Sequence, residues 1–211
     1  PPEADKPTLL FVRGADRSGG FFEFNPGDNE SELTEQLADI NNFATNGGNH
    51  GWGELRQTLE TAGFAVEQIT ETAENASGQG QSQGIHIDFE SMDLTEYDAI
   101  IFGSNNAVYD NAAVDAVEAY VRGGGSTLFI SDANFGSDWA DASNSDQAFL
   151  DRFGLVMHQD QGTYSLKRSG PADFVVPDHP IFTNVDQIDG EGVTPIRVEN
   201  PGSFGVEATI L

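Results

Sequence analysis

The sequence predicts an α/β fold with a doubly wound, mostly parallel β-sheet, helices on both faces and a β-rich C-terminal extension. Short apolar runs without polar alternation recur before Gly154, a pattern typical of parallel strands buried on both faces. Segments with apolar residues at helical spacing separate these runs, and this alternation favours a doubly wound sheet. After Gly154, short strand-like segments between Gly and Pro turns replace the helical pattern.

The part of the chain before the glycine run 123–125 supplies the strands and helices that this fold requires. The helix assignments rest on apolar spacing, with Ser31 as a plausible N-cap and with glycines at the helix ends. In chain order we expect a strand at 8–12, a helix at 31–43, a helix at 52–62, a strand at 64–69, a short edge strand at 85–89, a strand at 99–103, and a helix with Val114, Val117 and Val121 on its core face.

The stretch that follows this glycine run is expected to organise the functional site. Residues 127–130 form an apolar run that predicts a buried strand, and the small polar turn from Ser131 to Asn134 follows directly. In open parallel sheets, the loops that leave the carboxyl ends of strands carry the ligand site. Asp132 and Asn134 are therefore candidates, and a helix is expected over 147–153.

The C-terminal part predicts short strands at 163–167, 173–176, 193–198 and 206–211. They form either an extension of the main sheet or a small flanking sheet. We expect residues 1–7 to be a linker and residues 8–211 to be a single domain. Because the chain stops on an apolar segment, we also expect it to be part of a longer protein.

Charge is the most unusual feature of the composition. The 211 residues include 35 acidic and 9 basic side chains, a net charge of −26. Such a field disfavours nucleic acid and anionic membranes as partners, and no apolar run approaches the ~18 residues of a membrane span. The acidic surface indicates adaptation to salt, as in a marine or halophilic source; a surface that collects Ca²⁺ or cationic partners is the alternative.

Several segments occur in an order that a known family shares. They are 9–12 ahead of a Gly-rich turn, 94–101 (LTEYDAII), 119–125 (AYVRGGG), 138–139 with 149–154 and His158, and 178–181 (DHPI) followed by 189–191 (DGE). Across about residues 8–198 the chain resembles the ThuA-like (trehalose-utilisation-like) branch of the class I glutamine amidotransferase-like superfamily. The resemblance implies a flavodoxin-like fold and a carbohydrate context.

The chain departs from that superfamily at the turn 131–134. True amidotransferases carry a Cys nucleophile there, whereas this chain has Ser131, Asp132 and Asn134 and contains no Cys. Glutamine hydrolysis through a thiolate is therefore excluded. Asp132 with His179 is the candidate catalytic pair, since an Asp can orient a His for acid/base work. Both residues also suit structural turns, and that interpretation stays open.

The candidate ligand-binding residues lie in the expected loops or in the segments that resemble the family. Trp52 and His50 combine stacking with hydrogen bonding; a structural role, with Trp52 as the anchor of its loop, is the alternative. Most of the other candidates carry a carboxylate, an amide or an imidazole, groups that can form hydrogen bonds with a saccharide. The full set is Arg13, Asp16, His50, Trp52, Asn105, Asn106, Asn134, Asp138, Trp139, His158, Asp178 and Glu191. No metal-site motif is present and no cofactor is expected, with Ca²⁺ on acidic loops left open.

These observations lead to two functional hypotheses. The first is a non-catalytic or degenerate ThuA-like domain of an exported, salt-adapted protein that binds a saccharide or a partner domain. The alternative is a carbohydrate-active hydrolase or isomerase with Asp132 and His179 as acid and base; a purely structural module is a third option. We expect a small-molecule or oligosaccharide ligand, contacts with neighbouring domains of the same chain, and a secreted or periplasmic location, with a cytoplasmic one left open.

Overall fold

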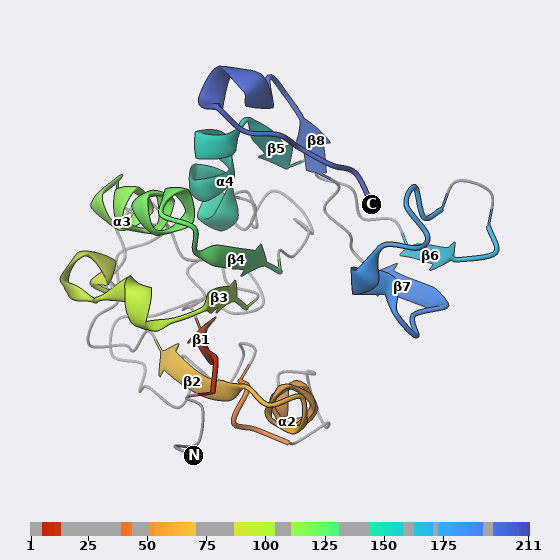
Figure 1. Cartoon of the computed structure of the whole chain (residues 1–211), viewed down its shortest axis with the longest axis horizontal. Helices are drawn as coiled ribbons and strands as arrows, with labels where there is room; N and C mark the ends of the chain where they lie inside the picture. Colours follow the sequence, from red (N-terminus) through yellow and green to blue (C-terminus); the bar gives the residue numbers. More distant parts are fainter. Residues whose placement is uncertain are drawn as a thin grey trace, which may run out of the picture.

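A four-stranded parallel sheet forms the centre of the molecule, in the order β2-β1-β3-β4 (Figure 1). The computed structural model describes residues 6–13, 39–43, 51–70, 87–103, 111–130, 144–157, 163–170, 173–191 and 196–211. The strands are β1 (Thr8–Arg13), β2 (Ala65–Thr70), β3 (Ala99–Phe102) and β4 (Ser126–Phe129). The predicted α/β fold class is therefore confirmed.

The central strands β1 and β3 are apolar on both sides because helices cover both faces of the sheet. Alternate residues of a strand point to opposite faces. Leu10 and Val12 of β1 contribute to the core on one face, and Leu9 and Phe11 contribute to the core on the other. All four are at most 5% exposed. This two-sided burial explains the continuous apolar run that predicted the strand.

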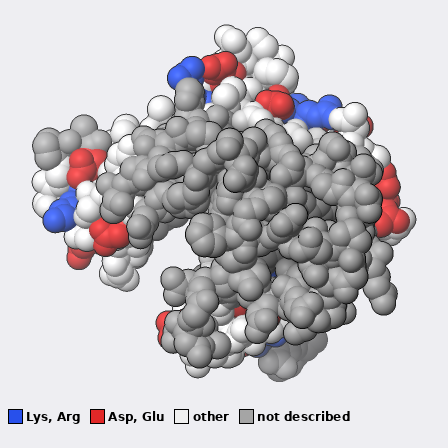
Figure 2. Space-filling model, turned by 180° about the vertical axis from the view of Figure 1, so that it is seen from behind, with Lys and Arg blue, Asp and Glu red and all other residues white. Residues whose placement is uncertain are grey.

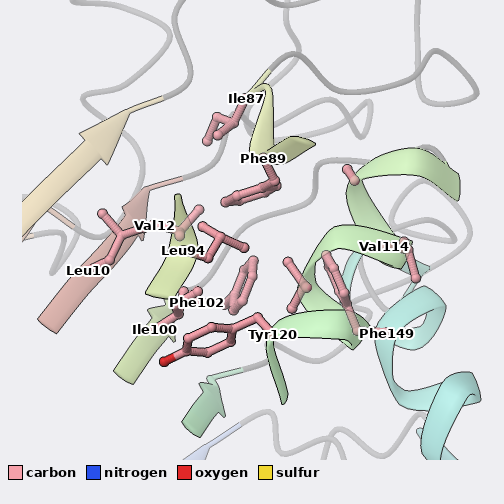
Figure 3. Packing of buried hydrophobic residues seen from close by; sticks show 12 residues of the cluster. Leu10, Val12, Ile87, Phe89, Leu94, Ile100, Phe102, Val114, Tyr120 and Phe149 are labelled. Carbon is pink, nitrogen blue, oxygen red and sulfur yellow. The ribbon is translucent and has the colours of Figure 1, made fainter. Parts of the chain in front are cut away.

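The helices divide between the two faces. Leu55 and Leu59 of α2 (Gly53–Thr61) pack on the same cluster as Leu9 and Phe11. The opposite face is covered by α3 (Asn111–Arg122), by Phe149 of α4 (Asn144–Leu150) and by the short 3₁₀ segments Phe89–Ser91 and Leu94–Glu96, as Figure 3 shows. The chain is thus wound on both faces of the sheet.

The glycine run after α3 sets the entry to β4. Gly124 has a φ of +105°, a left-handed conformation that favours glycine at a helix end. Gly125 lies against the Tyr120 ring, where an added Cβ would be 2.2 Å from the ring. The Tyr120 hydroxyl donates to the carbonyl of Tyr97 at 3.0 Å, so the same residue ties α3 to the entry of β3.

The strand expected to be buried in the organising stretch lies at an edge of the sheet instead. Among the described strands, β4 pairs with β3 alone. Ser126 and Leu128 are exposed, and Thr127 and Phe129 are half-buried. The prediction of a strand was right, and that of full burial was wrong, because one side of the strand has no described neighbour.

Two small antiparallel ladders stand outside the main sheet, so the flanking-sheet alternative describes the C-terminal part. One joins β5 (Leu155–Met157) to β8 (Ile196–Val198), and the other joins β6 (Thr163–Lys167) to β7 (Gln187–Glu191). Several expected elements are wrong within the described residues. They are the strands 173–176 and 206–211, the strand character of residues 87–89, and the helical conformation of residues 39–43.

None of the helices in the described segments is long and apolar enough to cross a membrane. On the face shown in Figure 2, the described acidic side chains lie at several separate points of the surface. Five of the described arginines form ion pairs at exposed or half-exposed positions: Arg56, Arg122, Arg152, Arg168 and Arg197. Most of the described arginines therefore have a carboxylate as an ion-pair partner.

Phe102 tests the two-sided core. It is fully buried, and its ring centre lies 4.7 Å from that of Phe129 and 5.0 Å from that of Phe149. Phe102→Ala should lower the free energy of unfolding by about 3–5 kcal/mol because it leaves a cavity in a packed aromatic cluster. Leu128→Ala, in the neighbouring strand but 52% exposed, should cost about 1 kcal/mol or less. Denaturant unfolding measures both, and equal losses would contradict this description of the core.

Candidate functional site

Most of the candidate residues fall outside the part of the chain that the structure describes. These are Asp16, His50, Asn105, Asn106, Asp132, Asn134, Asp138, Trp139 and His158. Glu191 ends β7, where it pairs with Thr163. The remaining four occupy two places: Arg13 and Trp52 lie at the main sheet, and Asp178 and His179 lie in the segment between β6 and β7.

Arg13 lies at the topological switch point of the sheet, where β1 has β2 on one side and β3 on the other. Ligands of open α/β sheets bind outside the carboxyl ends of the strands at this point. Arg13 is the last residue of β1 and only 7% exposed. Its Nη1 lies 3.3 Å from Oδ2 of Asp39. Burial lowers the pKa of Arg13, and the charge of Asp39 opposes that shift.

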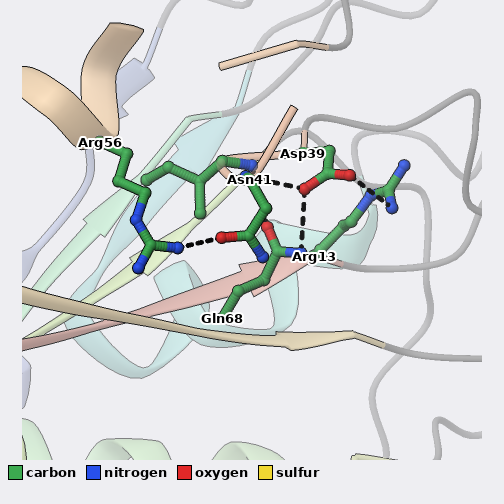
Figure 4. Close-up of polar contacts among 6 residues, drawn as sticks. Arg13, Asp39, Asn41, Arg56 and Gln68 are labelled. Atoms are coloured by element: carbon green, nitrogen blue, oxygen red, sulfur yellow. Dashed lines mark hydrogen bonds and ion pairs between the residues drawn. The ribbon is translucent and has the colours of Figure 1, made fainter. Parts of the chain in front are cut away.

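A set of hydrogen bonds holds Asp39 in place (Figure 4). Neither Asp39 nor its partner Gln68 was identified as an important residue from the sequence. Oδ1 of Asp39 accepts from the backbone N–H of Asn41 at 2.9 Å and from Nε2 of Gln68 at 3.1 Å. Gln68 Oε1 accepts in turn from the N–H of Ile40 at 2.9 Å. The cluster therefore joins β1, β2 and residues 39–41. In this arrangement Arg13 forms a structural ion pair with Asp39.

Trp52 is also part of this framework. It is the residue before α2, and its N–H donates to the carbonyl of Asp39 at 2.8 Å. Its ring centre lies 5.9 Å from that of Phe11, within the buried cluster under α2. Both contacts anchor the start of the helix, and no ligand-facing role is needed to explain them.

Asp178 and His179 line a shared pocket of about 350 Å³. The other lining residues come from the same stretch of chain between β6 and β7. They are Arg168, Pro177, Phe182, Thr183, Asn184 and Asp186. The structure thus places these two sequence neighbours, one proposed for binding and one for catalysis, beside Thr183, Asn184 and Asp186.

Arg168 organises the wall of this pocket. Its Nε and Nη2 donate to the carbonyl of Val185 at 3.1 and 3.0 Å, and its guanidinium also donates to the carbonyls of Pro177 and Phe182. The guanidinium lies over the Phe174 ring, 5.8 Å from its centre. A guanidinium has five N–H donors in a fixed plane, and here they hold the loop in one shape. The sequence carried no local signal for this role, which depends on residues brought together by folding.

His179 has one ring nitrogen committed to the backbone. Its Nδ1 accepts from the N–H of Ile181 at 3.3 Å, which caps the 3₁₀ turn Pro180–Phe182. Nδ1 therefore carries no hydrogen in this conformation, and Nε2 is the nitrogen that carries it. In a Ser-His-Asp triad, by contrast, the orienting carboxylate accepts from Nδ1–H. The pairing with Asp132 remains a prediction, because Asp132 is outside the described residues.

The pocket presents several polar groups at short range from one another. Asp178 and Asp186 supply carboxylates, Asn184 an amide, and Thr183 a hydroxyl that donates to the carbonyl of Pro180 at 2.7 Å. Phe182 is buried beneath them and stacks on Phe174. Within the described ranges, no group of three or more His or carboxylate side chains is placed to hold a metal ion. The arrangement suits hydrogen bonding to a neutral, polar ligand.

Comparison with known proteins gives a likeness to solved structures but not to a family model. No protein-family model matches the sequence, and no curated protein matches it. The fold is similar to a solved structure titled "mmIFT52 N-terminal domain", with 12% sequence identity and a TM-score of 0.47. The likeness covers 92% of this chain and 69% of that one. At this identity and TM-score it assigns neither a family nor an activity.

Asp39→Asn tests the cluster at the switch point. The substitution removes the charge that faces Arg13 but keeps an acceptor for Asn41, so Arg13 becomes a buried charge without its carboxylate. We expect a loss of about 1–3 kcal/mol in the free energy of unfolding. The control is Glu60→Gln, which breaks the exposed pair of Arg56 and Glu60 at 2.8 Å and should cost about 0.5 kcal/mol or less. A loss for Asp39→Asn no larger than for the control would refute the structural role.

Proposed function

We propose that this chain is a non-catalytic binding domain that takes a saccharide in the pocket between β6 and β7. One observation supports this most directly: Asp178 and His179 converge with Thr183, Asn184 and Asp186 around one hollow of about 350 Å³. Pockets for small ligands begin at about this size, on the order of 300 Å³. The hollow therefore suits a monosaccharide or the terminal unit of an oligosaccharide.

The polar groups around the pocket match the chemistry of sugar hydroxyls. A carboxylate accepts from hydroxyl groups, an amide both donates and accepts, and a neutral imidazole donates through Nε2–H. Together these groups supply both donors and acceptors for the hydroxyl groups of a sugar ring. The two carboxylates disfavour phosphorylated ligands, since the guanidinium of Arg168 already serves backbone carbonyls and lies 3.7 Å from Asp186.

Two facts favour binding over catalysis. The chain has no Cys for the covalent chemistry of the superfamily that it resembles. His179 uses Nδ1 to cap a turn, which leaves no Nδ1–H for an orienting carboxylate. The proposal places the domain in an exported, salt-adapted protein, since the net charge of −26 suits such surroundings.

Titration with a panel of neutral mono- and disaccharides, followed by NMR of the labelled protein, tests this proposal. The expected result is a saturable shift of the amides of residues 177–186. Asp178→Ala should weaken binding about tenfold or more, because a hydrogen bond to a charged group is worth about 1.5–3 kcal/mol. His179→Asn keeps a side chain that can cap the turn but removes Nε2–H, and it should weaken binding without unfolding the loop.

The matched control is Asp189→Ala, which removes the same charge from β7 at a residue outside the pocket lining. It should leave the affinity unchanged. Two results would overturn the proposal. One is the absence of a shift at residues 177–186 with every sugar in the panel. The other is chemical conversion of the bound sugar, which would make the domain an enzyme.

A further inference from the structure

The two edges of the main sheet are protected to different degrees. Exposed edge strands offer unpaired backbone groups, and proteins guard them with charged residues or Pro. The edge strand β2 carries Glu67, which is exposed and accepts from the Tyr97 hydroxyl at 3.2 Å. The edge strand β4 has the sequence STLF, without a charge or a Pro. In a chain with 35 acidic residues, an unguarded edge of this kind stands out.

The backbone groups on the outer side of β4 can be identified from its pairing. The N–H of Ile130 donates to the carbonyl of Phe102 at 3.0 Å, so Ile130 and Leu128 direct their backbone groups to β3. Alternate residues of a parallel strand direct these groups to opposite sides. Thr127 and Phe129 therefore direct theirs away from β3. Within the described residues, no hydrogen bond joins these outward groups to another segment.

The side chains of β4 also indicate a missing neighbour. Residues 127–130 read as a strand covered on all sides, yet Leu128 is 52% exposed. The face opposite to Leu128 is covered, since the Phe129 ring stacks with those of Phe102 and Phe149. On the Leu128 face, Ile130 is half-buried against the cluster of Leu9 and Phe11. Packing therefore explains the apolar pattern apart from the exposed Leu128 at the outer edge.

We propose that the outer edge of β4 binds an extended, basic segment of a partner protein by β-strand addition. Main-chain groups of Thr127 and Phe129 pair with the added strand, and Leu128 contacts one of its apolar side chains. The net charge of −26 attracts a basic segment and repels a second copy of this chain. This site is separate from the saccharide pocket, which lies between β6 and β7.

Hydrogen exchange at single amides tests the proposal. The probe is a blocked peptide of about six residues that alternates Lys and Val, a length typical of one strand. In the free protein, the amides of Thr127 and Phe129 should exchange quickly while those of Leu128 and Ile130 are protected. Addition of the peptide should slow exchange at Thr127 and Phe129 specifically. The same peptide methylated on alternate backbone nitrogens, and a Glu–Val version, should give no protection.

Two variants keep the test interpretable. Leu128→Lys places a positive charge on an exposed position and should weaken binding of the Lys–Val peptide about tenfold or more, without altering the spectrum of the free protein. Thr127→Pro removes one outward N–H, which the sheet itself does not use, and should abolish the protection of Phe129. If that variant does not fold, the lysine variant still decides.

Three results would overturn the proposal. Slow exchange at Thr127 and Phe129 in the free, dilute protein would mean that the chain covers its own edge. Protection that rises with protein concentration alone would assign the edge to a second copy. Peptide binding without protection at these two amides would show only charge attraction elsewhere on the acidic surface.

Discussion

Burial of β1 on both faces is the constraint on which the rest of the structure depends. A parallel strand in the middle of a sheet needs a layer of helices above and below it. Leu10 and Val12 pack in one cluster with residues of α3 and α4, while Leu9 and Phe11 pack in another cluster with residues of α2. The chain adds β2 on one side of β1 and β3 and β4 on the other, so the direction in which strands are added reverses at β1. Arg13 and Asp39 then form their ion pair at the end of this strand.

Elements whose signal is local could be predicted from the sequence. The apolar run of β1, the helical spacing of Val114 and Val117 and the glycines that end α3 all depend on neighbours in the chain. The strand β7 (QIDGE) was missed because it is polar and pairs only across the ladder with β6. Residues 174–176 are apolar but form no strand: Phe174 lies beneath the Arg168 guanidinium and stacks on Phe182, outside any ladder.

The candidate site, too, combines residues with a local sequence signal and residues without one. Asp178 and His179 were chosen from a motif, and the structure places both at one pocket. Arg168 and Asn184 could not be identified in this way, since their positions depend on backbone carbonyls and turns assembled by folding. Asp39 and Gln68 were missed for a similar reason: Asp39 contacts Arg13 of β1 and Gln68 of β2, residues far from it in the chain. The pocket proposed for a saccharide and the edge of β4 proposed for a protein partner belong to different elements, so the two proposals are independent of each other.

The tautomer of His179 distinguishes a binding domain from an enzyme most directly. Nitrogen-detected NMR of the labelled imidazole reports which ring nitrogen carries the hydrogen. We expect an Nε2–H tautomer with Nδ1 accepting from the N–H of Ile181, and a change at Nε2 when a saccharide is bound. An Nδ1–H hydrogen-bonded to a carboxylate would contradict it, because that arrangement is the one an acid/base catalyst uses.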